Sequence, residues 1–298
     1  MAKVHVICGG ISGEREVSLR SGAALAAALK KAGHSVAIFD TTDPLIMIAA
    51  CDVVFPALHG LGGEDGTLQA QLEANVITFI GSGSKASQLC FDKHVYRDFL
   101  LKHKLPIASG DTVHKAAYTK HRLAKKPHVL KPIDGGSSLD THIIRDVSQR
   151  DHKAISKSFD DHSTLLLEQL IVGTEITVGV LGNRALPVIE IIPPSNGEFD
   201  FVNKYNGKTK ELCPPKHVSK SDQEIAQQLA LTIHRLTGCR DFSRTDMILG
   251  RNGSITVLET NTIPGLTEQS LYPKMVAEHG LDMVQLVDQL VHTAIGRT

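Results

Sequence analysis

The sequence predicts a mixed α/β and α+β protein, in which a small parallel sheet comes first and antiparallel sheet follows. Strand and helix patterns alternate through the first 84 residues, as in βαβ units. Later, Gly182-Asn183 and Asn252-Gly253 each separate two apolar runs, which is a β-hairpin signal. A chain of 298 residues is long enough to form several hydrophobic cores. We therefore expect two or three domains.

The first domain is expected to span residues 1–84. Buried-strand patterns alternate with an alanine-rich helix and a shorter helix, and glycine-rich turns follow the strands at 9–13 and 59–66. Strands are predicted at 3–8, 35–39, 52–58 and 76–80, and helices at 15–32 and 67–74.

The rest of the chain divides at residue 168, into a short mixed domain (85–168) and a domain dominated by antiparallel sheet (169–298). Helices are predicted at 85–104, 222–238 and 281–295, and strands at 128–131, 142–144, 165–168, 175–181, 186–192 and on both sides of Asn252-Gly253.

Composition excludes several classes of protein. Lys plus Arg number 32 and Asp plus Glu number 32, so no net charge favours nucleic acid or an anionic membrane. The five cysteines are scattered, without a CxxC pair, which argues against disulfides and zinc and suits a reducing compartment. No segment approaches the length of a membrane span. We expect a soluble, unexported, cytoplasmic protein that binds neither nucleic acid nor membrane.

The predicted hairpin at Asn252-Gly253 carries four polar residues suited to a cation. If these two residues form a two-residue turn, Asp246 faces Glu259 and Arg244 faces Asn261, all on one side of the sheet. Opposed carboxylates repel unless a positive charge lies between them, and Mg²⁺ prefers such oxygen ligands. The alternative is a solvated strand face with scattered charge.

Two glycine-rich segments are candidates for binding ligands. Residues 9–13 lie between a strand and a helix, but the GxGxxG spacing of a dinucleotide-binding dehydrogenase is absent and a tight turn is an equal explanation. Glu14 beside them could receive an ammonium group. Gly135-Gly136-Ser137-Ser138 after Lys131 offers backbone N–H groups and hydroxyls to phosphate, or forms an ordinary turn. Taken alone, His59, Lys93 and Lys204 read as structural or surface residues, and Tyr205 as a half-buried aromatic.

Taken together, these motifs resemble the D-alanine–D-alanine ligases, in order and over nearly the entire chain. The matching segments are Gly9–Ser18, Leu58–Gly66, Asp92-Lys93, Lys131-Pro132 with Gly136-Ser137-Ser138, Lys204-Tyr205, Arg244-Thr-Asp246 and Leu258–Gly265. The resemblance implies the ATP-grasp fold: an N-terminal parallel-sheet (pre-ATP-grasp) domain and two α+β domains that sandwich ATP.

The implied reaction joins two D-alanine molecules for peptidoglycan precursor synthesis. ATP would phosphorylate one carboxylate to an acyl phosphate, and the amine of the second D-alanine would attack it, with release of ADP and phosphate. The resemblance also implies a homodimer and Mg²⁺ or Mn²⁺, two ions in all. Phosphoryl transfer mainly needs positioning and charge neutralisation, and a cover of residues 133–140 and 197–214 would keep water from the intermediate.

The resemblance assigns roles residue by residue. Asp246, Glu259 and Asn261 would hold the metal ions, while Arg244 and the Gly265 N–H would stabilise the oxyanion. The residues implied for ATP are Lys93, Lys131, Ser137, Ser138, Glu168, Gln169, Leu170, Ile171, Glu175 and Lys204. For the first amino acid, the resemblance implies Glu14, which would bind the ammonium group, and His59 close to it. Glu14 would also form a hydrogen-bonded set with Ser137 and Tyr205. For the second amino acid, Ser270 and the Leu271 backbone would receive the carboxylate.

Two departures and three alternatives stand beside this assignment. Relatives commonly carry Glu at the position of Gly135 and Gly at that of Asp140, which puts nucleotide affinity in question. Tyr205 favours the dipeptide over an ester product, but D-lactate or D-serine remain alternative second substrates. An ATP-grasp protein that binds without turnover is a second alternative, and a dehydrogenase a third.

Overall fold

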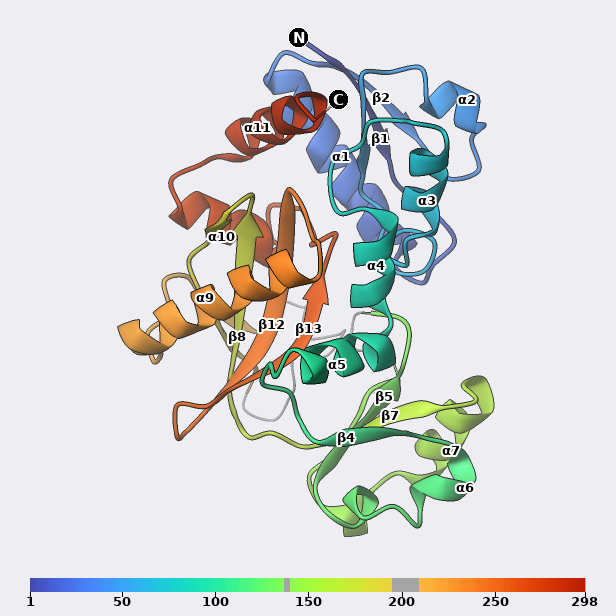
Figure 1. The fold of residues 1–298 in the computed structure, drawn as a ribbon, viewed down its shortest axis with the longest axis vertical. Coiled ribbons are helices and arrows are strands. Elements are labelled where there is room, and N and C mark those ends of the chain that lie inside the picture. The colour runs from blue at the N-terminus through green and yellow to red at the C-terminus, as the bar shows by residue number, and fades with distance from the viewer. Residues whose placement is uncertain (137–139, 195–208, 298) are drawn as a thin grey trace.

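The structure, a computed structural model, describes residues 1–136, 140–194 and 209–297. Three sheets follow one another along the long axis of the molecule, with the N-terminal sheet at one end and a four-stranded sheet at the other (Figure 1). The predicted combination of a parallel sheet with antiparallel sheets is confirmed. Within the described part of the chain, none of the helices combines the length and hydrophobicity needed to cross a bilayer.

The N-terminal sheet is parallel and has the strand order β2-β1-β3. Its elements are β1 (Lys3–Ile7), α1 (Arg15–Lys31), β2 (Ser35–Phe39), α2 (Leu45–Ile48), β3 (Val53–Pro56) and α3 (Thr67–Ala74). The strand predicted at 76–80 contributes a single parallel bridge, between Val54 and Phe79. Parallel neighbours place their strand ends at one edge, so the loops after β1 and β3 lie together there.

The last helix, α11 (Met283–Ile295), returns to the N-terminal sheet. Leu286, Val287 and Leu290 share a hydrophobic cluster with Val4 and Val6 of β1, and α11 packs along α1 (Figure 1). An Asp282 capping box starts this helix. The two ends of the chain therefore share one core.

The four-stranded sheet is antiparallel, with the order β4-β7-β5-β6. Its strands are β4 (Gly110–Val113), β5 (His128–Pro132), β6 (His142–Ile144) and β7 (Leu165–Gln169), and α6 (Lys115–Tyr118), η1 (Leu123–Lys125), η2 (Val147–Gln149) and α7 (His152–Asp161) accompany them. The prediction lacked β4 and α7.

The central sheet has six strands, in the order β11-β10-β8-β12-β13 with β9 paired to β8. Its elements are β8 (Gly173–Leu181), β9 (Arg184–Ala185), β10 (Ile189–Ile192), β11 (Lys210–Leu212), α9 (Lys220–Leu236), β12 (Phe242–Gly250), β13 (Ile255–Asn261) and α10 (Leu271–Glu278). The Gly182-Asn183 hairpin is confirmed, since Leu181 pairs with Arg184.

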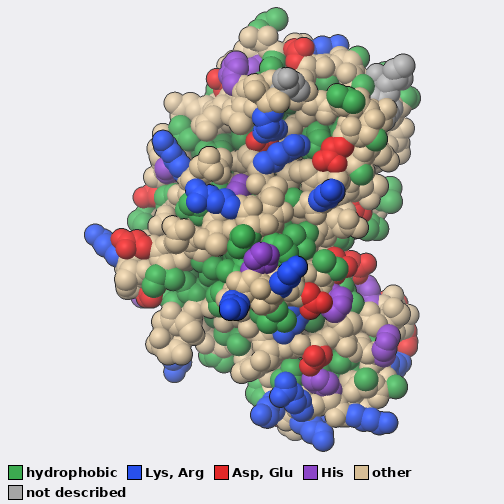
Figure 2. All heavy atoms as spheres, viewed as in Figure 1, with side chains coloured by type: hydrophobic (Ala, Val, Ile, Leu, Met, Phe, Trp, Pro, Cys, Tyr) green, Lys and Arg blue, Asp and Glu red, His purple; other side chains and the backbone are tan. Residues whose placement is uncertain are grey.

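The helix signals at 85–104 correspond to two helices, because Asp92 divides this segment into α4 (Ser84–Phe91) and α5 (Lys93–Lys102). Asp92 has an extended ψ of 104°, and its side chain accepts hydrogen bonds from the backbone N–H groups of His94 and Val95. Both helices pack against the central sheet and α9, α4 through Ala86 and Cys90 and α5 through Tyr96 and Leu100. Hydrophobic side chains gather on the surface over this α5–α9 region (Figure 2).

The turn of the β12–β13 hairpin also differs from the prediction, because it contains three residues, 251–253. Gly253 donates to the Gly250 carbonyl, Leu249 pairs with Ile255, and Gly253 has a φ of +78°. This turn alone would shift the pairing by one residue and send Glu259 to the other face. A β-bulge at Leu258 compensates, so Asp246 faces Glu259 as predicted.

Asp92 and Asp151 offer a matched test of helix capping. Asp151 caps α7 through two hydrogen bonds of 3.0 Å, much as Asp92 caps α5. Replacing either aspartate by alanine is expected to lower the free energy of unfolding by about 1 kcal/mol, since two backbone donors lose their acceptor. Urea denaturation measures both changes, and no loss in either variant would contradict the capping roles.

His234 makes stability depend on pH. It is buried beside Ser243, with Nδ1 2.7 Å from Ser243 Oγ, and burial lowers its pKa to about 4. The unfolded chain therefore takes up this proton first as the pH falls from about 6.5, and stability declines by on the order of 2 kcal/mol at about pH 5.

Urea denaturation at about pH 7.5 and about pH 5 tests this, with the exposed His279 as control. The His234→Gln variant is expected to lose most of this pH dependence, whereas His279→Gln keeps it. An equal pH dependence in all three proteins would show that His234 is not the responsible group.

Candidate functional site

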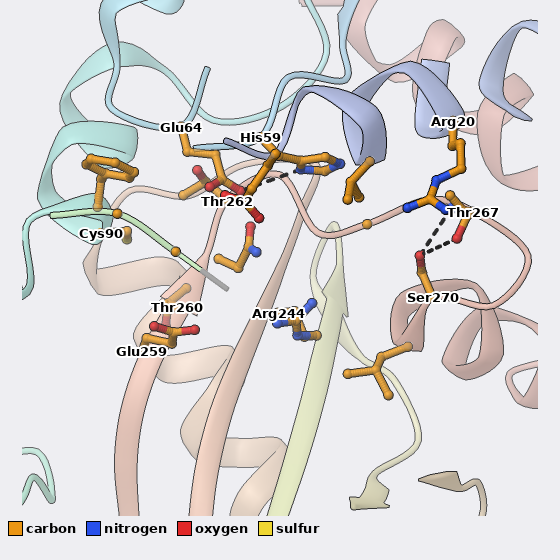
Figure 3. A pocket seen from close by; sticks show the side chains of 18 of the residues that line it. Arg20, His59, Glu64, Cys90, Arg244, Glu259, Thr260, Thr262, Thr267 and Ser270 are labelled. Carbon is orange, nitrogen blue, oxygen red and sulfur yellow. Dashed lines mark hydrogen bonds and ion pairs between the residues drawn. The ribbon is translucent and has the colours of Figure 1, made fainter. Parts of the chain in front are cut away.

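A cavity of about 430 Å³ lies where the N-terminal loops, α4 and α5, and the central sheet meet. Nine residues singled out from the sequence line it: Glu14, His59, Lys93, Arg244, Glu259, Asn261, Gly265, Ser270 and Leu271. Figure 3 shows Arg244 and Glu259 on one side of it and His59, Glu64 and Arg20 on the other. The fold thus brings together side chains from opposite ends of the chain.

The hairpin face supplies the acidic part of the site. Arg244 donates from Nε and Nη2 to the two Asp246 carboxylate oxygens, both at 2.8 Å, and Thr177 Oγ1 donates to Asp246 at 2.6 Å. Burial alone would lower the pKa of Arg244, but the Asp246 charge raises it well above its usual value. In this structure, Arg244 supplies the positive charge beside Asp246.

On the opposite face of β12 and β13, three hydroxyl groups in the core contact one another. Thr245 and Thr260 are paired across the hairpin with hydroxyl oxygens 3.0 Å apart, and the Tyr96 hydroxyl lies 2.6 Å from Thr260 Oγ1. These three side chains are buried. They connect α5 to the hairpin and fix which face the carboxylates present.

The donor set on the hairpin fits a hard divalent cation. Asp246 and Glu259 contribute carboxylates at paired positions, and Asn261 contributes an amide oxygen that accepts from the Ile263 N–H at 2.9 Å. Oxygen ligands of this kind suit Mg²⁺ or Mn²⁺, and each retains further lone pairs. Among the described residues, no group of three or more His, Cys, Asp or Glu side chains is arranged to hold a metal ion, so two carboxylates and an amide form the candidate set.

Two lysines lie near this acidic face. Lys93 Nζ donates to the Gly135 carbonyl at 2.5 Å, and burial lowers its pKa, while Glu259 acts in the opposite direction. Lys131 pairs with Glu168 at 2.7 Å; burial lowers its pKa, but the Glu168 charge outweighs this and the pKa is raised. Both lysines are therefore within electrostatic reach of Glu259.

Glu168, one of the residues implied for ATP, has a side chain that contacts two cations. Its buried carboxylate accepts from Lys131 and, at 3.3 Å, from Arg97 of α5. Removing one partner of a buried ion pair leaves an uncompensated charge, so this carboxylate fixes the position of Lys131. The sequence did not single out Arg97, which is 71 residues away.

The N-terminal loops place Glu14 and His59 at the cavity. The Glu14 carboxylate is buried against two glycines, such that an added Cβ would lie 2.9 Å from it at Gly60 and 3.1 Å at Gly136. His59 Nε2 lies 3.1 Å from Ser21 Oγ, and Nδ1 lies 3.8 Å from Glu64 Oε1. Side chains larger than glycine would crowd Glu14.

At the far end of the cavity, β13 runs into the start of α10. Ser270 is the N-cap residue of α10, but its side chain makes no capping hydrogen bond. Its Oγ instead accepts from the Thr267 N–H at 3.2 Å and lies 2.8 Å from Thr267 Oγ1 (Figure 3). The N–H groups of the first turn of α10 therefore face the cavity end without a side-chain acceptor.

The remaining predicted residues lie elsewhere. Glu168 and Gln169 end β7, and Leu170 and Ile171 continue toward β8, so this segment connects the four-stranded sheet to the central sheet; Glu175 lies on β8. These residues, Lys131 and Asp246 are not part of the cavity lining. Ser137, Ser138, Lys204 and Tyr205, with most of the predicted cover, lie outside the described residues.

Besides Arg97, the sequence reasoning missed four residues that support the site: Ser21, Glu64, Thr177 and Arg20. Ser21 lies seven residues after Glu14, which is the spacing of one helix face, and Glu64 stands in the quoted glycine-rich loop. Thr177 reaches Asp246 from a neighbouring strand, where no local signal marks it. Arg20 lines the cavity beside Ser270.

Comparison with known proteins gives a consistent result. Residues 102–292 match the family model described as D-ala D-ala ligase C-terminus. Proteins named D-alanine--D-alanine ligase from Rhizorhabdus wittichii and Xanthobacter autotrophicus are each 39% identical, over 98% and 99% of this chain and 96% and 99% of their own.

Solved structures agree in fold. A D-alanine--D-alanine ligase from Bacillus anthracis complexed with ATP has a TM-score of 0.83 at 26% identity, covering 100% of this chain and 98% of its own. The VanG D-Ala:D-Ser ligase from Enterococcus faecalis has a TM-score of 0.82 at 28% identity, covering 97% and 98%. The chain belongs to the D-alanine–D-alanine ligase family and has its ATP-grasp fold.

Proposed function

We propose that this ATP-dependent ligase joins two D-alanine molecules through an acyl phosphate. The observation that carries the proposal is the single cavity that places a buried carboxylate (Glu14), two cations (Lys93 and Arg244) and the hairpin oxygens within one space. An amino acid has an ammonium and a carboxylate, and ATP has phosphates, so these groups match in charge.

The reaction proceeds in two balanced steps. A carboxylate oxygen of the first D-alanine attacks the γ-phosphorus of ATP, and the bond to the ADP oxygen breaks. The amine nitrogen of the second D-alanine then attacks the acyl carbon, the bond from this carbon to the phosphate oxygen breaks, and the proton that the amine loses is taken up by the released phosphate or by water. The negative charge that develops on the acyl oxygen is the one that buried donors stabilise.

The residues of this chain divide this work by position. Glu14 binds the ammonium of the first amino acid and thereby orients its carboxylate toward Arg244. Lys93 and Lys131 neutralise phosphate oxygens, and Glu168 holds Lys131 in place. Segment 168–171 and Glu175 are proposed to receive adenine and ribose.

Asp246, Glu259 and Asn261 would hold Mg²⁺ or Mn²⁺. When bound, the ions supply neutralisation of the nucleotide phosphate charge. Arg244 now occupies both oxygens of Asp246, so its guanidinium is held next to the acyl oxygen that it is proposed to stabilise.

The second substrate has one specific alternative. The VanG neighbour is named a D-Ala:D-Ser ligase, and its fold covers nearly all of this chain. D-Alanine remains the first choice, supported by the names of the most similar curated relatives. The homodimer, the cytoplasmic location and the role in peptidoglycan precursor synthesis stay predictions from the family resemblance.

The proposal predicts stereoselective, metal-dependent ADP release. ADP is expected with D-alanine and Mg²⁺, and not with L-alanine, without an amino acid, or with excess chelator. Asp246→Asn and Glu259→Gln are expected to lower kcat on the order of 100-fold or more, because each replaces a carboxylate proposed to bind the metal ions by a neutral amide.

The exposed Glu278 on α10 provides the control, and Glu278→Gln is expected to retain full activity. Mass spectrometry of the product with D-alanine, D-serine and D-lactate identifies the second substrate. Full turnover in both hairpin variants would contradict the proposal, and ADP release equal for L- and D-alanine would remove the substrate assignment.

Gly135 provides a test of the phosphate loop. The sequence alone favours Gly135→Glu as harmless or helpful, because relatives carry Glu. In this structure Gly135 has a φ of +93° and its carbonyl accepts from Lys93, a conformation that a glutamate adopts only with strain. We now expect Gly135→Glu to raise the KM for ATP by several-fold, and an unchanged or lower KM would contradict the loop role.

A further inference from the structure

Arg20 of α1 is a cation at the cavity for which the described residues provide no hydrogen-bond or ion-pair partner. It lines the cavity together with Glu14 and Val17, at spacings of three residues along one helix face. Figure 3 shows its guanidinium directed toward Thr267 and Ser270. An exposed arginine normally extends into solvent, whereas this one is directed along the cavity wall.

Among the described residues, no carboxylate lies within ion-pair distance of Arg20, although the exposed Glu268 lines the same cavity. Ser270 Oγ is hydrogen-bonded to Thr267, and the first turn of α10 has no side-chain cap. Backbone N–H groups with a guanidinium beside them form a site for a planar carboxylate.

The distance along α1 fits a two-residue product. Glu14 and Arg20 are six positions apart, which corresponds to about 9 Å along a helix. Two extended residues span about 7 Å, which is similar to this separation. One helix would therefore contact the ammonium of the first amino acid and the carboxylate of the second.

We propose that Arg20 binds the carboxylate of the second amino acid, as a specificity-determining cation beside Ser270 and Leu271. This rests on the proposed function, in which Glu14 binds the first ammonium. Because D-alanine, D-serine and D-lactate all carry this carboxylate, the assignment holds for each of them. It predicts that acceptors without the carboxylate bind more weakly at the second position.

D-Alaninamide distinguishes this role from a structural one. It has an amine but no carboxylate, so it serves only as the second substrate, with D-alanine as the first. The unaltered protein is expected to have a much lower KM for D-alanine than for D-alaninamide at the second position. Arg20→Gln is expected to raise the second KM for D-alanine about tenfold, with little change in the first KM or in the KM for D-alaninamide.

Arg20→Lys serves as the conservative variant, and Lys30→Gln serves as the control. Arg20→Lys is expected to recover part of the affinity, since it keeps the charge without the planar fork. Lys30 is exposed near the end of the same helix, and Lys30→Gln is expected to behave as the unaltered protein. Thermal unfolding of each variant shows whether a loss of activity reflects a loss of folded protein.

Separate results test the inference and the proposed function. No ADP release by the unaltered protein with D-alanine would contradict the proposed function. Normal release with an unchanged second KM in Arg20→Gln, or equal rises for D-alanine and D-alaninamide, would overturn the Arg20 assignment alone. Calorimetry with D-alanyl-D-alanine provides a readout without turnover, and Arg20→Gln is expected to weaken its binding about tenfold.

Discussion

The register of β12 against β13 is the constraint on which the candidate site depends. A three-residue turn shifts this register by one position, and the bulge at Leu258 shifts it back before the functional residues are reached. Only then do Asp246 and Glu259 share a face, because side chains alternate with a period of two. The buried Thr245–Thr260–Tyr96 contacts oppose a slip, since they would have to exchange places with charged groups.

Charge balance around Glu259 links the separate parts of the site. The charge of Glu259 acts on Arg244, Lys93 and Lys131, which come from different elements: it contributes to the raised pKa values of Arg244 and Lys131, and it opposes the burial that lowers the pKa of Lys93. Buried ion pairs are expensive to desolvate and contribute little to stability. The gathering of buried charged side chains at one cavity therefore indicates a function. Because the fold already holds these side chains in place, they need no reorganisation when a charged substrate binds.

Local periodicity predicted most of the strands and longer helices, and the glycine-rich motifs predicted which loops line the cavity. Sequence reasoning failed at one local helix cap and at contacts between residues far apart in the chain. The hydrophobic pattern runs through Asp92, and only its capping bonds reveal the break. The return of α11 to the N-terminal sheet and the Arg97–Glu168 pair join residues far apart in the chain. The pairing of Asp246 with Glu259 was predicted correctly, although the predicted two-residue turn is absent. The three-residue turn and the bulge shift the register in opposite directions, so the pairing is the same.

The central claim is that the hairpin oxygens bind the cation that carries the nucleotide charge. The most direct test is a crystal structure with Mn²⁺ and a non-hydrolysable ATP analogue, in which anomalous scattering locates the ions. Manganese is expected within roughly 2.0–2.4 Å of oxygens from Asp246, Glu259 and Asn261, between them and the phosphates. Manganese bound elsewhere, with these three side chains out of its reach, would contradict the account.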